Sequence, residues 1–156
     1  MDKYKIVEEL VKLANAELIK AEEAYNSTNM MATEGDMKQE SKYDTRGIEA
    51  AYLAGAQKKR VEELKLDLRK LEDFLGFEFK KNDEVVLGSI VEVNMGKEVR
   101  RYFVAPAFGG IQLHIGNESV YVISLISPMG DAMLGLSEDE EFELDPTKKY
   151  IVNKIS

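Results

Sequence analysis

The residues best suited to chemistry are acids spaced four apart near position 40 of the chain. They are Asp36, Glu40 and Asp44. If this segment is helical, the spacing places the three carboxylates in one row, where like charges repel by about 0.2–0.5 kcal/mol per pair. Such a row is typical either of a solvated helix face or of a site that meets a cation or a partner protein.

Asp36 has two interpretations. Asp36 and Gln39 fit a capping box, and a carboxylate near a helix N-terminus is favoured by about 0.3–1 kcal/mol. The carboxylate could instead serve a functional site. The two roles are compatible, because capping would also fix the direction of the carboxylate.

Two helices must position these acids. From Asp2 to about Tyr25 apolar residues recur every three or four positions, which predicts a first amphipathic helix. The run Asn26 to Asn29 hydrogen-bonds the backbone locally, so we expect this helix to end there, with a bend over residues 26–34. A second helix should run from Thr33 to about Phe74, as a helical hairpin with the first.

The apolar seam of the second helix changes along its length. Leucines dominate near Leu75, and alanine, glycine and then acids follow toward the bend. A dimerising coiled coil would continue its leucines, so we expect an intramolecular hairpin and a monomer. If the hairpin folds symmetrically about residue 31, the leucine-rich end of the second helix extends past the start of the first helix. We expect that end to dock on the rest of the chain.

After Gly76 the pattern predicts a small β-rich domain. The expected strands cover residues 84–93, 99–105, 119–126, 141–144 and 150–155, and a short helix covers Ser127 to Met133. The expected fold class is therefore α+β, with a helical hairpin over residues 1–75 and an antiparallel sheet of about five strands with one short helix over residues 76–156.

Composition limits the classes of function that the chain could have. The 156-residue chain has a net charge of -8 and no cysteine, which disfavours unaided binding along a nucleic-acid backbone and excludes disulfides and Cys-ligated zinc. The single histidine, His114, is expected to be structural, and no nucleophile elbow or phosphate loop is present. We find no signal peptide pattern and no membrane-length apolar run, so a cytoplasmic location is expected.

Two motifs resemble those of the GreA/GreB family of bacterial transcript-cleavage factors, and the resemblance covers nearly the whole chain. The first is Gly35-Asp36-Met37-Lys38-Gln39-Glu40, with Tyr43 further on, which is similar to the family's hairpin-tip motif. The second is the stretch from Ser127 to Gly135, Ser-Pro-Met-Gly-Asp-Ala-Met-Leu-Gly, which is similar to a motif of the family's FKBP-like base.

The resemblance implies an accessory factor rather than an enzyme. Such a factor binds RNA polymerase at its secondary channel, meets DNA and RNA only through the polymerase, and holds no cofactor stably. The tip acids Asp36 and Glu40 would assist the polymerase, with Asp36 as a weak, shared ligand of Mg²⁺ at the polymerase active centre. The implied partner-binding residues are Lys38, Tyr43, Ser127, Pro128 and Met129.

The tip departs from the family pattern at one position. Gln39 stands where the family has a second acid, and Glu40 is displaced by one residue, roughly 100° around a helix. Two alternatives therefore stay open beside cleavage stimulation. One is a regulator that occupies the channel without promoting cleavage, and the other is a coiled-coil interaction module without catalytic consequence.

Overall fold

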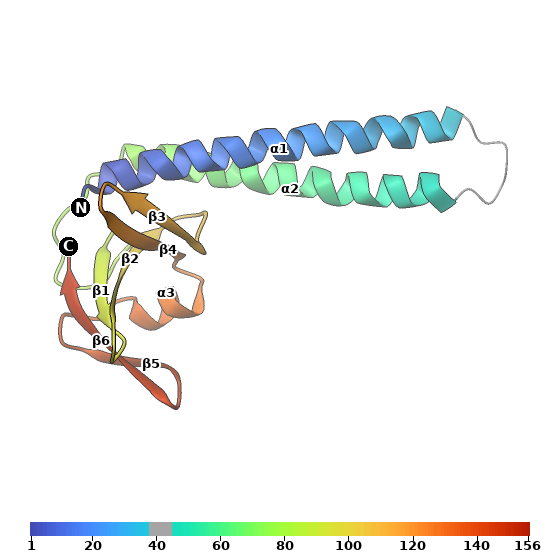
Figure 1. Cartoon of the computed structure of the whole chain (residues 1–156). Helices are drawn as coiled ribbons and strands as arrows, with labels where there is room; N and C mark the ends of the chain where they lie inside the picture. Colours follow the sequence, from blue (N-terminus) through green and yellow to red (C-terminus); the bar gives the residue numbers. More distant parts are fainter. Residues whose placement is uncertain (38–44) are drawn as a thin grey trace. The chain divides into compact units, whose positions relative to one another are not determined.

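Two long helices begin the chain. The computed structural model describes the backbone of residues 1–37 and 45–156, and the side chains of residues 1–31 and 46–156. Helix α1 covers Lys3–Met37 and helix α2 covers Thr45–Leu75, and they run in opposite directions (Figure 1). The expected helical hairpin is confirmed.

The predicted bend between the helices is wrong. The run Asn26 to Asn29 does not end α1, which continues to Met37, and α2 begins at Thr45 instead of Thr33. The local hydrogen bonding of asparagine, serine and threonine is worth little beside packing against a second helix, which decides helical structure in most proteins. Tyr25 and Asn26 line one groove with Val61 of α2, so α1 still has a partner helix where it was expected to end.

The register of the hairpin also differs from the expected symmetry about residue 31. Lys65 Nζ lies 3.5 Å from a carboxylate oxygen of Glu22, whereas that symmetry would have paired Glu22 with Glu40. At the other end, the Tyr4 hydroxyl donates a hydrogen bond of 3.3 Å to the carbonyl of Phe77. The start of α1 therefore lies beside residues that follow α2, and the expected overhang of the leucine end is wrong.

The β-rich part is a six-stranded sheet with the order β3-β4-β2-β1-β6-β5. Its strands are β1 (Ile90–Asn94), β2 (Val99–Ala105), β3 (Ile111–Ile115), β4 (Glu118–Ser124), β5 (Glu141–Asp145) and β6 (Lys148–Ile155), and the short helix α3 (Pro128–Met133) follows β4. The predicted α+β class is confirmed. The sheet has one strand more than expected and is mixed, because β2 and β4 pair in parallel.

Side chains of the sheet pack on both of its faces, because successive residues of a strand point to opposite sides. Tyr102 and Val104 belong to a buried cluster with Met133 of α3. Phe103, the residue between them in the sequence, points to the other face and is fully buried. The centre of its ring lies 6.4 Å from the ring centres of both Phe74 and Phe79. The second face is thus closed by aromatic residues at and after the end of α2.

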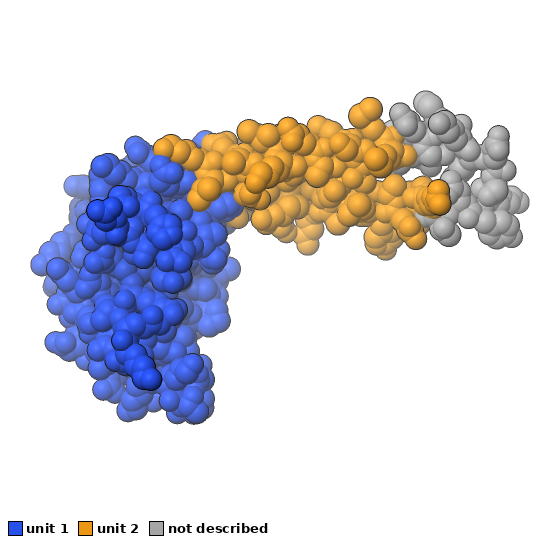
Figure 2. All heavy atoms as spheres, in the orientation of Figure 1, with its two compact units in different colours: residues 1–11, 70–156 blue, residues 12–69 orange. Residues whose placement is uncertain are grey.

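Contacts divide the chain into two compact units (Figure 2). Unit 1 contains residues 1–11 and 70–156, and unit 2 contains residues 12–69. The predicted division at residue 75 follows the end of α2. In the contact division, however, the start of α1 and the end of α2 belong to the same unit as the sheet. None of the described helices is long and apolar enough to span a membrane.

Candidate functional site

The first candidate site is the connection between α1 and α2. Asp36 lies in the last turn of α1, which ends at Met37, and its side chain is outside the described part of the structure. Lys38, Gln39, Glu40 and Tyr43 lie outside the described residues altogether. Their predicted roles as tip acid or partner contacts stay predictions.

The boundary of α1 removes the capping explanation for Asp36. A capping box requires the N-terminus of a helix, and Asp36 is at a C-terminus. The helix dipole there disfavours a negative charge by about 0.3–1 kcal/mol. The acidic row of Asp36, Glu40 and Asp44 stays a prediction, because Glu40 and Asp44 lie outside the described residues. Asp36 is thus left without the structural reason that the sequence suggested.

Unit 2 contains most of both helices and buries small and aliphatic residues. The buried side chains are Ala14, Ala54, Val61 and Leu64. Ala14 and Ala54 are small and buried, so they fill little space between the helices. Several apolar side chains of the same unit are instead exposed, among them Met30, Met31, Ile48, Leu53 and Tyr52, the last at 84%.

The second candidate site is the turn that leads into α3 in unit 1. Ser127 is the N-cap of α3: its hydroxyl oxygen accepts a hydrogen bond from the Gly130 N–H at 3.1 Å and donates one to the Ser124 carbonyl at 2.7 Å. Pro128 follows at the first helical position, where it has no N–H to satisfy. The predicted short helix from Ser127 is confirmed, and its start is held by the serine and proline of the motif.

The side chains of this segment divide between core and surface. Met129 is half-buried against the cluster that contains Met133, and Met133 itself is fully buried. The implied role of Met129 in partner binding stays a prediction, and only the exposed part of its side chain could serve it. Ile126, immediately before the motif, is 94% exposed, and Leu134 after it is 48% exposed. These two residues, together with exposed Pro128, form the apolar surface of the α3 turn.

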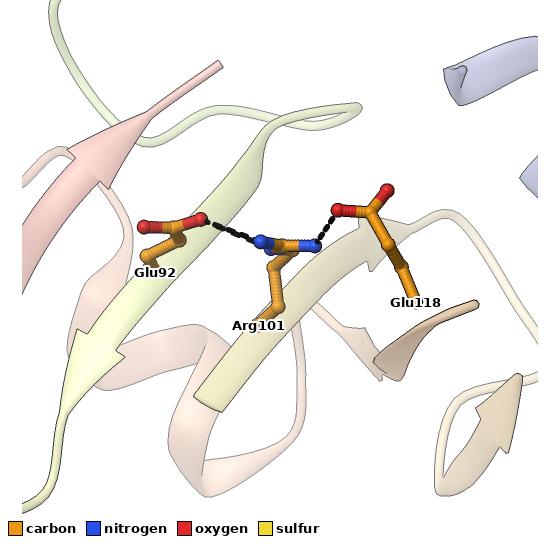
Figure 3. Close-up of polar contacts among 3 residues, drawn as sticks. All are labelled: Glu92, Arg101 and Glu118. Carbon is orange, nitrogen blue, oxygen red and sulfur yellow. Dashed lines mark hydrogen bonds and ion pairs between the residues drawn. The ribbon is translucent and has the colours of Figure 1, made fainter. Parts of the chain in front are cut away.

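A charged group on the sheet was not expected from the sequence. Arg101 of β2 lies 3.0 Å from Glu92 of β1 and 2.6 Å from Glu118 of β4 (Figure 3). The hydrogen bond that Arg101 donates to the Glu118 carboxylate raises the pKa of Arg101, so the guanidinium stays charged. Since β4 pairs with β2 only from Tyr121 onward, Arg101 of β2 links the start of β4 to β2 and to β1, the strand on the other side of β2.

Arg101→Gln is expected to lower the free energy of unfolding by ~1 kcal/mol, because it removes charge-assisted hydrogen bonds to two half-exposed carboxylates. Chemical denaturation followed by circular dichroism measures the change. Lys149→Gln is the matched control, since it removes one exposed ion pair, at 3.4 Å from Glu141, and should cost almost nothing. Equal stability of the two variants would contradict the proposed link between the strands.

The acids that follow the α3 motif have structural partners. A carboxylate oxygen of Glu138 accepts a hydrogen bond from the Ile155 N–H at 2.9 Å, and one of Glu140 accepts from the Ser137 N–H at 2.7 Å. Within the described residues no group of three or more histidine, aspartate or glutamate side chains is arranged to hold a metal ion. His114 lies exposed on β3, with no metal-binding group around it in that part of the chain.

The chain is similar to GreA factor homologues of known structure. GreA factor homolog 1 (Gfh1) of Thermus thermophilus is 24% identical, with 94% of both chains covered and a TM-score of 0.38. Gfh1 of Thermus aquaticus is 25% identical over 92% of both chains, with a TM-score of 0.38. A further structure of the transcription factor Gfh1 is 26% identical, covers 93% of this chain and 92% of its own, and has a TM-score of 0.39. No protein-family model and no curated protein matches the chain.

The exposed apolar residue that sequence reasoning missed at the α3 turn is Ile126. Its signal was a lone isoleucine between a strand and a Ser-Pro turn, which periodicity cannot distinguish from a last buried strand residue.

Proposed function

We propose that this protein is a Gre-type transcription factor that binds RNA polymerase at the secondary channel and modulates cleavage of backtracked RNA. What supports the proposal most is the position of the Gly35-Asp36 motif, in the last turn of α1 just before the connection to α2. An acid at this end of a helix has no capping role, and at the end of a hairpin it is suited to reach into a partner's site.

The chemistry proposed for the tip belongs to the polymerase active centre. Mg²⁺ takes few protein carboxylates and keeps several waters, so a second ion there is held weakly. The Asp36 carboxylate would add one ligand and favour binding of that ion, and the ion in turn would activate water for phosphodiester hydrolysis. This chain would then be an accessory factor with no cofactor of its own, and a monomer.

Gln39 favours a second function, in which the protein occupies the channel and regulates the polymerase without promoting cleavage. The neutral amide cannot supply the second negative charge that the motif of the GreA/GreB family provides. Both functions require polymerase binding, so binding is the first property to test. Variants that change the charge at Asp36 or Gln39 then distinguish the two functions, because only cleavage stimulation depends on that charge.

Ile126→Asp is expected to weaken polymerase binding by about tenfold, because it places a charge at the most exposed residue of the apolar surface of the α3 turn, and loss of a central interface residue costs more than about 1 kcal/mol. Fluorescence anisotropy of the labelled protein with purified bacterial RNA polymerase measures the affinity. Ile126 is 94% exposed, so the variant should keep its melting temperature.

The matched control is Val99→Asp, the same kind of change at a 56% exposed residue of β2. It should bind as the parent protein does. If Ile126→Asp and Val99→Asp bind equally well, the α3 turn is not the docking surface, and if the parent protein does not bind polymerase at all, the proposed function is wrong. Met129→Asp is a poorer test, since a charge on this half-buried side chain would also disturb the core.

A further inference from the structure

A pocket of about 660 Å³ in unit 1 gathers four lysines. We call it the lysine pocket and define it by Lys3, Lys80, Lys81 and Lys154. They come from the start of α1, the segment after α2, and β6, so they are far apart in sequence. The aromatic contact of Tyr4 with Phe79, at 4.9 Å, and the backbone hydrogen bonds between Ser156 and Ile90, at 2.9 Å, hold these segments.

The positive charge of the lysine pocket is only partly balanced. Lys80 lies 3.5 Å from Glu78, but both side chains are largely exposed. Among the described residues, Lys3, Lys81 and Lys154 make no ion pair. Glu138 also lines the pocket, but one of its oxygens accepts the hydrogen bond of the Ile155 N–H. The pocket is therefore locally basic in a chain whose net charge is -8.

Lys3 is the partly buried lysine of the pocket. Its ammonium nitrogen lies 5.5 Å from the centre of the Phe79 ring, and burial lowers the pKa of Lys3. Burial disfavours the charged amine, and Glu138, which also lines the pocket, already accepts the hydrogen bond of the Ile155 N–H. An anion in the pocket would supply the missing opposite charge.

We propose that the lysine pocket binds a small oligophosphate through several phosphate groups at once. Lysine ammonium groups bind phosphate oxygens as point charges, and ammonium groups from three segments suit a ligand with charges spread along a chain. Phe79 already packs against Tyr4, Phe74 and Phe77, so it is not available to stack on a base. Recognition should therefore depend on the phosphate chain and not on a nucleoside.

This proposal does not rest on the proposed polymerase function, because it concerns the protein alone. Isothermal titration calorimetry with inorganic triphosphate, without Mg²⁺ and at low ionic strength, should detect binding to the full chain. The double variant Lys81→Gln/Lys154→Gln should bind about tenfold more weakly, since each lysine contributes a partly screened charge interaction. Binding should also raise the pKa of the Lys3 amine, which can be followed by NMR after isotopic methylation of the lysines.

The matched control is Lys59→Gln/Lys97→Gln, which changes net charge equally at two exposed lysines outside the pocket. It should keep the parent affinity to within about twofold. ATP should bind like inorganic triphosphate; much tighter binding of ATP would overturn the inference that only phosphate is recognised. Undetectable binding to the parent protein, or equal weakening in both double variants, would overturn the site itself.

Discussion

Asp36→Asn should lower the transcript cleavage that we propose for this protein by on the order of tenfold or more, while polymerase binding stays unchanged. The asparagine amide has nearly the shape of the carboxylate but no charge with which to help hold a weakly bound Mg²⁺. Because Asp36 lies near the C-terminus of α1, removing its charge should not lower helix stability. The measurement is RNA cleavage in backtracked complexes at saturating protein.

Two further variants separate the roles of the neighbouring residues. Gln39→Glu restores the second acid of the GreA/GreB motif and should raise cleavage, because a further negative charge strengthens recruitment of the ion. Glu40→Gln tests whether the displaced acid substitutes for it. If the parent protein and Gln39→Glu both bind a backtracked complex and neither promotes cleavage, then metal delivery is wrong and channel occupancy is the function.

Gly130→Ala should destabilise unit 1 by about 3 kcal/mol, which corresponds to a fall of roughly 10 °C or more in melting temperature. A Cβ atom at Gly130 would lie 2.1 Å from the Ser124 carbonyl oxygen and 3.1 Å from the Ser127 hydroxyl oxygen. The first atom belongs to the backbone, so the helix α3 would have to move away from the end of β4. The motif glycine is therefore required for close packing of the turn that presents Ile126.

Gly55→Ala is the control for this change. A Cβ atom at Gly55 meets nothing within 4 Å, and Gly55 lies inside α2, where alanine is favoured over glycine by about 1 kcal/mol. Thermal unfolding should therefore show a small gain in stability for Gly55→Ala. A Gly130→Ala variant as stable as the parent protein would mean that the turn can open without a loss of stability. The close packing of α3 against the end of β4 would then not be what holds Ile126 in place.

Local patterns predicted the elements whose boundaries depend on nearby residues. The expected strand over residues 99–105 agrees with β2, because a run of β-branched and aromatic residues is followed by Pro106. The start of α3 was predicted from Ser127 and Pro128, which act on their own turn. The predicted strand over residues 84–93 is shorter in the structure, where β1 begins at Ile90 after Gly88, whose φ of +85° interrupts an extended chain.

Elements that depend on distant partners could not be predicted in this way. Strand β3, over Ile111–Ile115, lies between Gly110 and Gly116, so its sequence reads as a glycine-containing loop, and it is a strand because it pairs with β4. The parallel pairing of β2 with β4 likewise has no local signal. The same holds for α1, which passes through Asn26 to Asn29 because α2 packs beside it.

The candidate sites likewise include features that depend on nearby residues and features that depend on distant ones. The motifs at Asp36 and at Ser127 are contiguous in sequence, so each could be recognised from its own residues. Burial of Met129, exposure of Ile126 and the gathering of Lys3, Lys81 and Lys154 depend on contacts between segments far apart in the chain. Side-chain types and spacing carry information about the turn of helix or strand to which they belong. Which of those side chains meet, and which face solvent, is decided only when the sheet and the helices pack.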